Sequence, residues 1–79
     1  MNERLAAILA AVFGLRESEI HPDLKKADVG TWDSLKQMDL VITLEREYSI
    51  ALEIPDILRM VSIGGIIEVL KEKGKDLEN

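Results

Sequence analysis

Apolar residues near the start of the chain recur at the spacing of one helix face. They fall at positions i, i+3, i+4, i+7 and i+8, as Leu5, Ile8, Leu9, Val12 and Phe13. We therefore predict a first amphipathic helix from about residue 2 to residue 15. It should end near Gly14, because glycine readily adopts the left-handed conformation that closes many helices.

The stretch from Ser34 to Tyr48 predicts a second helix with two apolar stripes. At roughly 100° of rotation per residue, four residues line up as a stripe that should face the core: Leu40, Val41, Leu44 and Tyr48. A second stripe beside it consists of Leu35, Met38 and Ile42. The helix has more apolar surface than one contact needs, so the second stripe should meet another helix or a partner.

Two further helices are predicted after this one. Pro55 suits the first turn of a short third helix, from about residue 55 to residue 61, because proline lacks the N–H that would have no partner there. Ser62 is a suitable N-cap for a fourth helix. The apolar face of that helix consists of Ile63, Ile66, Ile67 and Leu70. Gly64 and Gly65 weaken its first turn, which is tolerable where another backbone must approach closely.

Residues 16–33 show no sustained periodicity and predict a long loop with a short turn around Leu24. Loops this long in small domains are usually functional or disordered; three spaced apolar anchors favour an ordered loop across the bundle, namely Ile20, Leu24 and Val29. The predicted fold is all-α: a small four-helix bundle with three longer helices, one short helix and a long loop between helices 1 and 2. Residues 1–75 should form this single domain, and residues 76–79 a charged, frayed tail.

The composition supports a small aliphatic core and excludes thiol chemistry by the chain itself. A chain of 79 residues forms at most one domain. It is 47% hydrophobic but only 4% aromatic, so Leu, Ile, Val and Ala must fill the interior. Cysteine is absent, which excludes a disulfide framework, a Cys-based metal site and a Cys nucleophile.

The net charge of −5 argues against nucleic acid or an anionic membrane as the main partner, since both repel an acidic surface. Basic patches on partner proteins are the better counterpart. The apolar start does not match a signal peptide, because Glu3 stands where such a signal needs positive charge. No apolar run is long enough for insertion across a membrane, so we expect a cytoplasmic protein.

Residues suited to catalysis are few. His21, the only histidine, precedes Pro22 in the predicted loop, where we interpret it as an ordinary exposed residue. A triad of Ser34, His21 and an aspartate is conceivable, but nothing around Ser34 matches the Gly-x-Ser-x-Gly turn of hydrolases. A histidine pair and an acidic calcium-binding loop are also absent from the sequence, so no metal site is predicted.

Asp33-Ser34-Leu35 stands out because it ends the loop and opens the most apolar helix. Taken alone, Ser34 followed by Gln37 matches a capping box, in which the serine caps the helix and the glutamine reaches back. This local interpretation makes Ser34 a helix N-cap and nothing more.

The wider setting of Ser34 resembles the signature of acyl carrier proteins. In that family an Asp-Ser-Leu begins the second helix, an acidic residue and an apolar pair follow, and an acid-rich end closes on an aromatic residue. The corresponding stretches here are Asp33 to Val41 and Leu44-Glu45-Arg46-Glu47-Tyr48. The resemblance covers nearly the whole chain and continues through Ile50, Leu52, Pro55 and Ser62-Ile63.

The resemblance implies that a phosphopantetheinyl transferase attaches phosphopantetheine to the Ser34 hydroxyl through a phosphodiester. The terminal thiol of this arm would hold acyl or aminoacyl intermediates as thioesters. Asp33 and Leu35 would border the cofactor, and Asp33 would also help to cap the helix and be recognised by the attaching enzyme. The implied partners are an acyl-activating ligase or synthase, a ketosynthase or an acyltransferase. The chain itself would be a monomer that catalyses no reaction.

Partner recognition in this family is carried largely by the second helix and the loop before it. By resemblance, the apolar docking residues are Leu35, Met38 and Ile42. Four acids would meet basic residues of the partner: Asp39, Glu45, Glu47 and Asp56. The alternative interpretation of these acids is a solvated helix face without a partner.

Several residues depart from the pattern of carriers in fatty-acid synthesis. Lys36, Arg46 and Arg59 dilute the acidity, and Trp32 is bulkier than the residue usual two positions before the serine. Trp32 either covers the loop against the core or contacts the arm or a partner. These departures favour a specialised discrete carrier for lipid, polyketide, peptide or aminoacyl transfer. Two alternatives stay open: a helical interaction module in which Ser34 is only an N-cap, and a hydrolytic or transferase fragment with a serine nucleophile.

Overall fold

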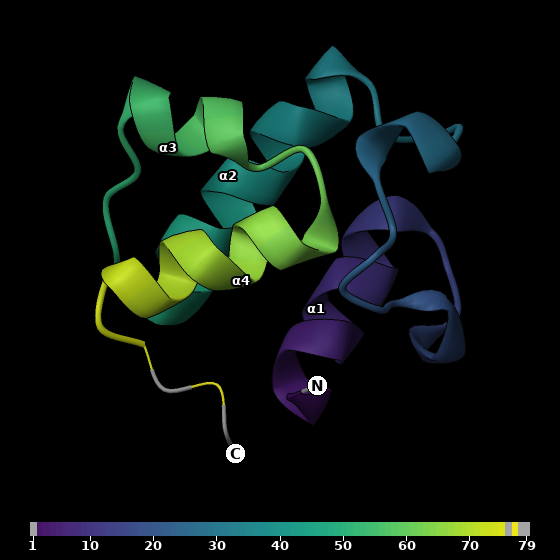
Figure 1. The fold of residues 1–79 in the computed structure, drawn as a ribbon, viewed down its shortest axis with the longest axis horizontal. Helices are drawn as coiled ribbons and strands as arrows, with labels where there is room; N and C mark the ends of the chain where they lie inside the picture. The colour runs from purple at the N-terminus through teal and green to yellow at the C-terminus, as the bar shows by residue number, and fades with distance from the viewer. Residues whose placement is uncertain (1, 76, 78–79) are drawn as a thin grey trace.

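The computed structural model describes residues 2–75 and 77 and shows a bundle of four helices (Figure 1). They are α1 (Glu3–Phe13), α2 (Ser34–Tyr48), α3 (Ile54–Arg59) and α4 (Ile63–Glu72). The described residues contain no β-strand, and α3, with six residues, is much shorter than the others. The predicted all-α bundle of three longer helices and one short helix is confirmed. None of the described helices is long and apolar enough to cross a membrane.

α1 begins and ends at residues that satisfy its free backbone groups. The Asn2 side chain accepts a hydrogen bond of 2.9 Å from the Leu5 amide. At the other end, Gly14 has a φ of 69°, in the left-handed region, and donates its N–H to the Ala10 carbonyl. The predicted stop at Gly14 is confirmed, although the helix is shorter at both ends than the predicted residues 2–15.

The core lies where α1, α2 and α4 meet. The predicted core stripe of α2 is buried: Leu40, Val41, Leu44 and Tyr48. It packs in one cluster with residues of the other two helices, among them Leu5, Leu9, Phe13, Ile63, Ile66 and Leu70. Ile67 is only partly buried, whereas Val69 and Met60 are buried without having been predicted. The interior is mainly aliphatic, as the composition predicted.

The long loop between α1 and α2 is ordered. It contains two 3₁₀ turns, Glu17–Glu19 and Lys26–Asp28, and a further turn that ends at Leu24. The predicted anchors pack against the core, two of them buried and one partly buried: Ile20, Val29 and Leu24. The Lys26 N–H also donates to the Val61 carbonyl at 2.9 Å, which ties the loop to the segment before α4.

α3 and α4 meet at a close backbone contact. Pro55 lies in the first turn of α3, and the Ser62 hydroxyl caps α4 by accepting a hydrogen bond of 2.9 Å from the Gly65 amide. Both predicted roles are confirmed, although α3 begins and ends earlier than predicted, at Ile54–Arg59. A Cβ at Gly65 would overlap the carbonyl oxygen of Arg59. The glycine is therefore needed for the close approach that the sequence suggested.

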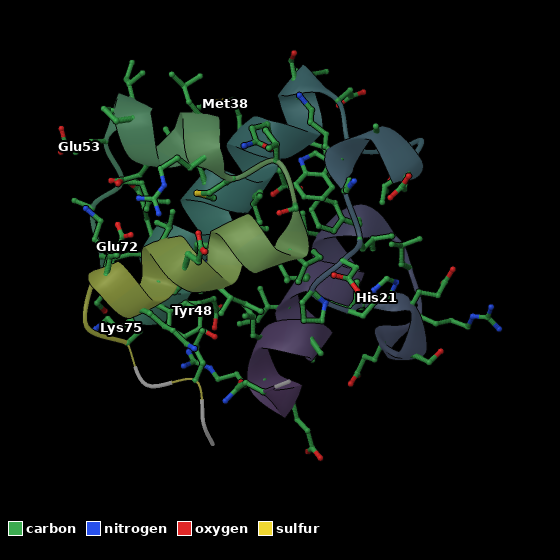
Figure 2. All side chains as sticks on the ribbon, in the orientation of Figure 1. His21, Met38, Tyr48, Glu53, Glu72 and Lys75 are labelled. Atoms are coloured by element: carbon green, nitrogen blue, oxygen red, sulfur yellow. The ribbon has the colours of Figure 1, made fainter. Side chains whose placement is uncertain are left out.

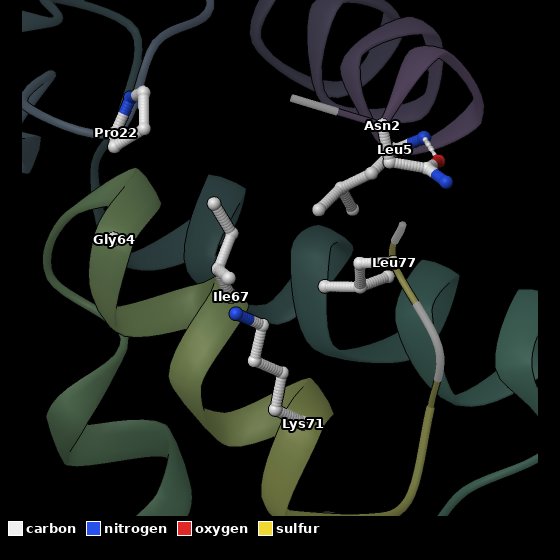
Figure 3. Close-up of a pocket in the computed structure, with 7 residues that line it drawn as sticks. All are labelled: Asn2, Leu5, Pro22, Gly64, Ile67, Lys71 and Leu77. Atoms are coloured by element: carbon white, nitrogen blue, oxygen red, sulfur yellow. Dashed lines mark hydrogen bonds between the residues drawn. The ribbon is translucent and has the colours of Figure 1, made fainter. Parts of the chain in front are cut away.

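A cavity of about 300 Å³ lies between α1, α4 and the C-terminal segment (Figure 3). Its lining consists of Asn2, Leu5, Pro22, Gly64, Ile67, Lys71 and Leu77. No residue of α2 lines it, so it is separate from Ser34. Leu77 is buried, but residues 76, 78 and 79 lie outside the described part of the chain. The predicted domain boundary and tail therefore stay a prediction.

Candidate functional site

Ser34 is the first residue of α2, and Asp33 is the N-cap. The Asp33 carboxylate accepts a hydrogen bond of 2.9 Å from the backbone N–H of Lys36. The Asp33 backbone carbonyl accepts one of 2.8 Å from the backbone N–H of Gln37. The interpretation of Ser34 as the N-cap in a capping box with Gln37 is therefore wrong. An aspartate caps a helix as well as a serine does, and its negative charge also interacts favourably with the positive end of the helix dipole. The cap consequently lies one residue earlier than the capping-box motif suggested, and the part in capping that the resemblance implied for Asp33 is confirmed.

The Ser34 hydroxyl is left available for other chemistry. The residue is exposed, and its hydroxyl makes no hydrogen bond with any residue in the described part of the chain. The first N–H groups of a helix lack intrahelical partners and carry positive partial charge, which suits a phosphate. α2 has 15 residues, so several turns contribute to its dipole. Exposure and position at residue 34 thus fit a phosphate ester.

Trp32 closes the loop directly before α2. Only 3% of its surface is exposed, and its ring centroid lies 4.4 Å from that of Phe13. Its Nε1–H donates to Oε1 of Gln37 at 2.5 Å. The side-chain nitrogen of Gln37, Nε2, donates in turn to the backbone carbonyls of Met60 at 3.1 Å and Ile57 at 3.3 Å. Of the two interpretations of Trp32, covering the loop against the core is the one that the structure supports.

Six large apolar side chains on α2 and around α3 are exposed. Leu35, at the start of the second stripe of α2, is 83% exposed, and Ile54 and Leu58 on α3 are each 71% exposed. We call this set the apolar face: Leu35, Met38, Ile42, Ile54, Leu58 and Val61. Figure 2 shows Met38 at the top of the molecule, where α2 lies next to α3. Sequence reasoning missed the α3 half, although the four-residue spacing of Ile54 and Leu58 was a signal for it.

Two of the four acids predicted for docking have partners within α2 or just after it. The Asp39 carboxylate lies 3.8 Å from the Lys36 ammonium and accepts a hydrogen bond from the Thr43 hydroxyl. The Glu45 carboxylate accepts a hydrogen bond of 2.9 Å from the Leu52 amide. Glu45 thus holds the turn after α2 as well as lying near the surface.

The other two acids are tied to different helices. Arg4 of α1 donates to the Glu47 carbonyl at 2.6 Å and lies 3.4 Å from its carboxylate. The Asp56 carboxylate accepts a hydrogen bond of 2.9 Å from the Glu53 amide and lies 3.0 Å from the Lys73 ammonium. The Glu53 amide and then the Lys73 side chain lower the pKa of Asp56. All four acids therefore have a contact inside the fold, whereas the apolar face has no cover among the described residues.

Among the described residues, no side chain makes a hydrogen bond to the Ser34 hydroxyl that could activate it. His21 is exposed in the loop, as predicted (Figure 2), and no hydrogen bond joins it to Ser34 in the part of the chain that the structure describes. Within the same residues, no cluster of three or more His, Asp or Glu could hold a metal ion. The features around Ser34 are thus a free hydroxyl, a helix N-terminus and an apolar surface.

Comparison with known proteins finds similarity to one family over most of the chain. The model of the family described as phosphopantetheine attachment site matches residues 3–70. Non-reducing polyketide synthases of Emericella nidulans and Hypocrea jecorina are 31% and 34% identical, over 91% and 86% of this chain but only 3% and 2% of each synthase. An acyl carrier protein of Thermotoga maritima is 26% identical over 89% of this chain and 86% of its own length. The chain thus spans a small part of the synthases and most of the carrier protein.

Proposed function

Since this chain belongs to the family of phosphopantetheine attachment sites, the carrier-protein family, we propose that Ser34 is the residue that receives the arm. Three observations support the assignment. Ser34 lies in the Asp-Ser-Leu stretch of the family signature. It is exposed at the first position of α2, and Asp33 performs the capping that would otherwise occupy its hydroxyl.

Attachment requires little of the chain beyond a free hydroxyl in the right place. In the transferase reaction the Ser34 oxygen would form a bond to the pantetheine-side phosphorus of coenzyme A. Its proton would pass to a base of the transferase, and adenosine bisphosphate would leave. The resulting phosphodiester is an anion, which the N-terminal amides and the dipole of α2 would stabilise. The arm, when attached, supplies a terminal thiol that carries an acyl group as a thioester; the chain has no cysteine to compete with it.

The function that follows is that of a discrete carrier without catalysis of its own. It would hold acyl or aminoacyl intermediates and present them to an acyl-activating ligase, a ketosynthase or an acyltransferase. The similarity to both a separate acyl carrier protein and segments of polyketide synthases supports a carrier role. The dilution of acidity by Lys36, Arg46 and Arg59 supports a dedicated pathway, such as polyketide, peptide, aminoacyl or modified-lipid assembly.

Docking would use the surface next to Ser34. The enzyme that acts on the end of the arm must approach this residue, and the predicted docking stripe of Leu35, Met38 and Ile42 begins directly after it. We propose that this stripe carries most of the contact and that Asp39, Glu45, Glu47 and Asp56 contribute at its border. Since those four acids already have contacts inside the fold, the apolar side chains should dominate the affinity.

The decisive experiment is a measurement of intact mass after incubation with coenzyme A and a broad-specificity phosphopantetheinyl transferase. The wild type should gain the mass of one phosphopantetheine. Ser34→Ala should gain none, while Ser18→Ala, which changes another exposed serine, should be modified like the wild type. Failure of the wild type to gain this mass with several such transferases would refute the carrier function. Modification of Ser34→Ala would refute the residue assignment alone.

A further inference from the structure

The side chain of Gln37 joins three segments of the chain around Ser34. Its amide oxygen accepts from the Trp32 indole N–H at 2.5 Å. Its amide nitrogen donates to the carbonyls of Met60 and Ile57 at 3.1 and 3.3 Å. Trp32 precedes Ser34 by two residues and Gln37 follows it by three, so the hydrogen bond between them spans the proposed attachment position in the sequence. Their hydrogen bonds thereby connect the loop, α2 and α3.

The direction of these bonds is set by chemistry. An indole N–H can only donate, so the amide oxygen of Gln37 must face Trp32. The NH₂ group must then face α3, where it meets two carbonyl oxygens, which can only accept. Trp32 is itself held by its contact with Phe13 in the core. The arrangement therefore fixes one orientation of the Gln37 amide.

α3 depends on such contacts for its position. A helix of six residues is not stable by itself, because nucleation is unfavourable and few backbone bonds follow it. Toward α4 it is held by the ion pairs Asp56–Lys73 and Arg59–Glu72. Toward α2, the hydrogen bonds that the described residues provide are those of Gln37. The Met60 carbonyl, just after α3, accepts from no backbone N–H among the described residues, as is usual at a helix C-terminus, whereas the Ile57 carbonyl also accepts from the Met60 N–H at 3.1 Å.

We propose that Gln37 is a positioning residue that fixes α3 relative to Ser34, so that both halves of the apolar face meet a partner as one surface. The inference rests on the proposed carrier function and adds a specific device to it. Leu35 and Met38 lie on α2 on either side of Gln37, and Leu58 and Val61 flank the carbonyl that it binds at Met60. Without this contact α3 samples other positions. A partner then binds only the fraction of molecules with the complete face, and the apparent affinity falls by that fraction.

The test uses variants that separate the two halves of the contact. Gln37→Glu keeps an acceptor for the Trp32 N–H but cannot donate to the α3 carbonyls, whereas Gln37→Leu loses both. Val69→Ala is the control, since it removes buried side-chain volume from α4 without touching the contact. The first measurement is hydrogen exchange at the α3 amides of the unmodified protein. The second is the emission of Trp32, the only tryptophan. The third is the kinetics of phosphopantetheinyl transferase with each variant as substrate.

For Gln37→Glu we expect the transferase KM for the carrier to rise about tenfold, with kcat within about twofold, because only about one molecule in ten then presents the complete face. The α3 amides should accordingly lose most of their protection from exchange, since α3 is displaced in most molecules. Trp32 emission should stay near that of the wild type in Gln37→Glu and shift in Gln37→Leu. Val69→Ala should lower the melting temperature without raising KM. Wild-type exchange and KM in Gln37→Glu would overturn the proposal, and so would an equal rise of KM in Val69→Ala. Failure of the wild type to be modified would refute the carrier function instead, and the exchange result would still show whether Gln37 holds α3.

Discussion

Removal of the Ser34 side chain should abolish attachment without weakening the fold. Ser34 is exposed, and its hydroxyl makes no hydrogen bond to another described residue. Alanine is also a better helix former than serine by a few tenths of a kcal/mol, about 0.5 at most. We therefore expect the free energy of unfolding of Ser34→Ala to lie within about 0.5 kcal/mol of the wild type.

Removal of the neighbouring Asp33 side chain should have the opposite effect on stability. Asp33→Ala deletes the hydrogen bond of 2.9 Å to the Lys36 amide, and loss of an N-cap costs about 1 kcal/mol. It also deletes a negative charge at the positive end of α2, which contributes roughly 0.3 to 1 kcal/mol. The total of about 1 to 2 kcal/mol should lower the melting temperature by about 4 to 16 °C in a domain of this size.

Thermal unfolding followed by circular dichroism would measure both effects, with intact mass as the readout of attachment. Asp33→Asn is the matched control, because it keeps an acceptor for the Lys36 amide and removes only the charge. Its melting temperature should lie between those of Asp33→Ala and the wild type. A loss of more than about 1 kcal/mol in Ser34→Ala together with an unchanged Asp33→Ala would refute the assignment of the cap. Ser34 would then be the structural residue that the sequence motif first suggested.

Three further predictions follow from the packing and charges. Gly65→Ala should destabilise the protein by about 1 to 3 kcal/mol in urea unfolding, because its methyl group would overlap the Arg59 carbonyl, although alanine favours helices. An unchanged midpoint of urea unfolding would show that α3 moves freely. The pKa of Asp56 is lowered in the fold, mainly by the Glu53 backbone N–H and then by the Lys73 side chain. The ionised carboxylate therefore contributes its whole stabilisation at pH values above the ordinary aspartate pKa. This stabilisation is lost as the pH falls through the lowered pKa of the folded state. Asp56→Asn should therefore flatten the loss of stability in acid, and an unaltered pH profile would contradict the ion pair. Leu58→Glu should raise the transferase KM about tenfold while leaving the melting temperature unchanged, since the residue is exposed. Raising the salt concentration from about 0.05 to 0.5 M should change the wild-type KM less than about threefold, because apolar contact is not screened. A steep dependence of KM on salt would instead assign docking to the acids.

Helix periodicity was sufficient to predict the order of the helices and the buried face of α2, because the core consists mainly of aliphatic residues at regular helical spacing. The bounds of α2 agree with the prediction, Ser34–Tyr48, and its core stripe is buried as expected. Local chemistry also placed Gly14 and Ser62 at the ends of their helices. These features depend on residues a few positions apart, so a single sequence contains the information that determines them.

Contacts between distant segments could not be predicted in the same way. The role of Gln37 depends on Trp32 in the loop and on two carbonyls at the end of α3. The sequence instead predicted that Gln37 completes a capping box, because only its spacing from Ser34 can be read there. The α3 half of the apolar face was missed although Ile54 and Leu58 lie four residues apart, because in a helix of six residues this spacing alone does not show whether the side that it marks is buried or exposed.

The position of the cap at Asp33 explains how Ser34, the proposed attachment residue, keeps a free hydroxyl. The hydroxyl of a serine that caps a helix is not free to react with an enzyme, because its oxygen accepts a hydrogen bond from a backbone N–H. The backbone of such a serine is also held in the extended conformation of an N-cap. Here Asp33 accepts from the Lys36 amide, and Gln37, which could have completed a box, is bound to Trp32 and α3. Ser34 is consequently the first residue of the helix, beside the positive end of its dipole, and its hydroxyl makes no hydrogen bond to another described residue. The pair Asp33-Ser34 thus divides two tasks that one residue could not perform together: Asp33 stabilises the helix, and the Ser34 hydroxyl is left free for the proposed attachment.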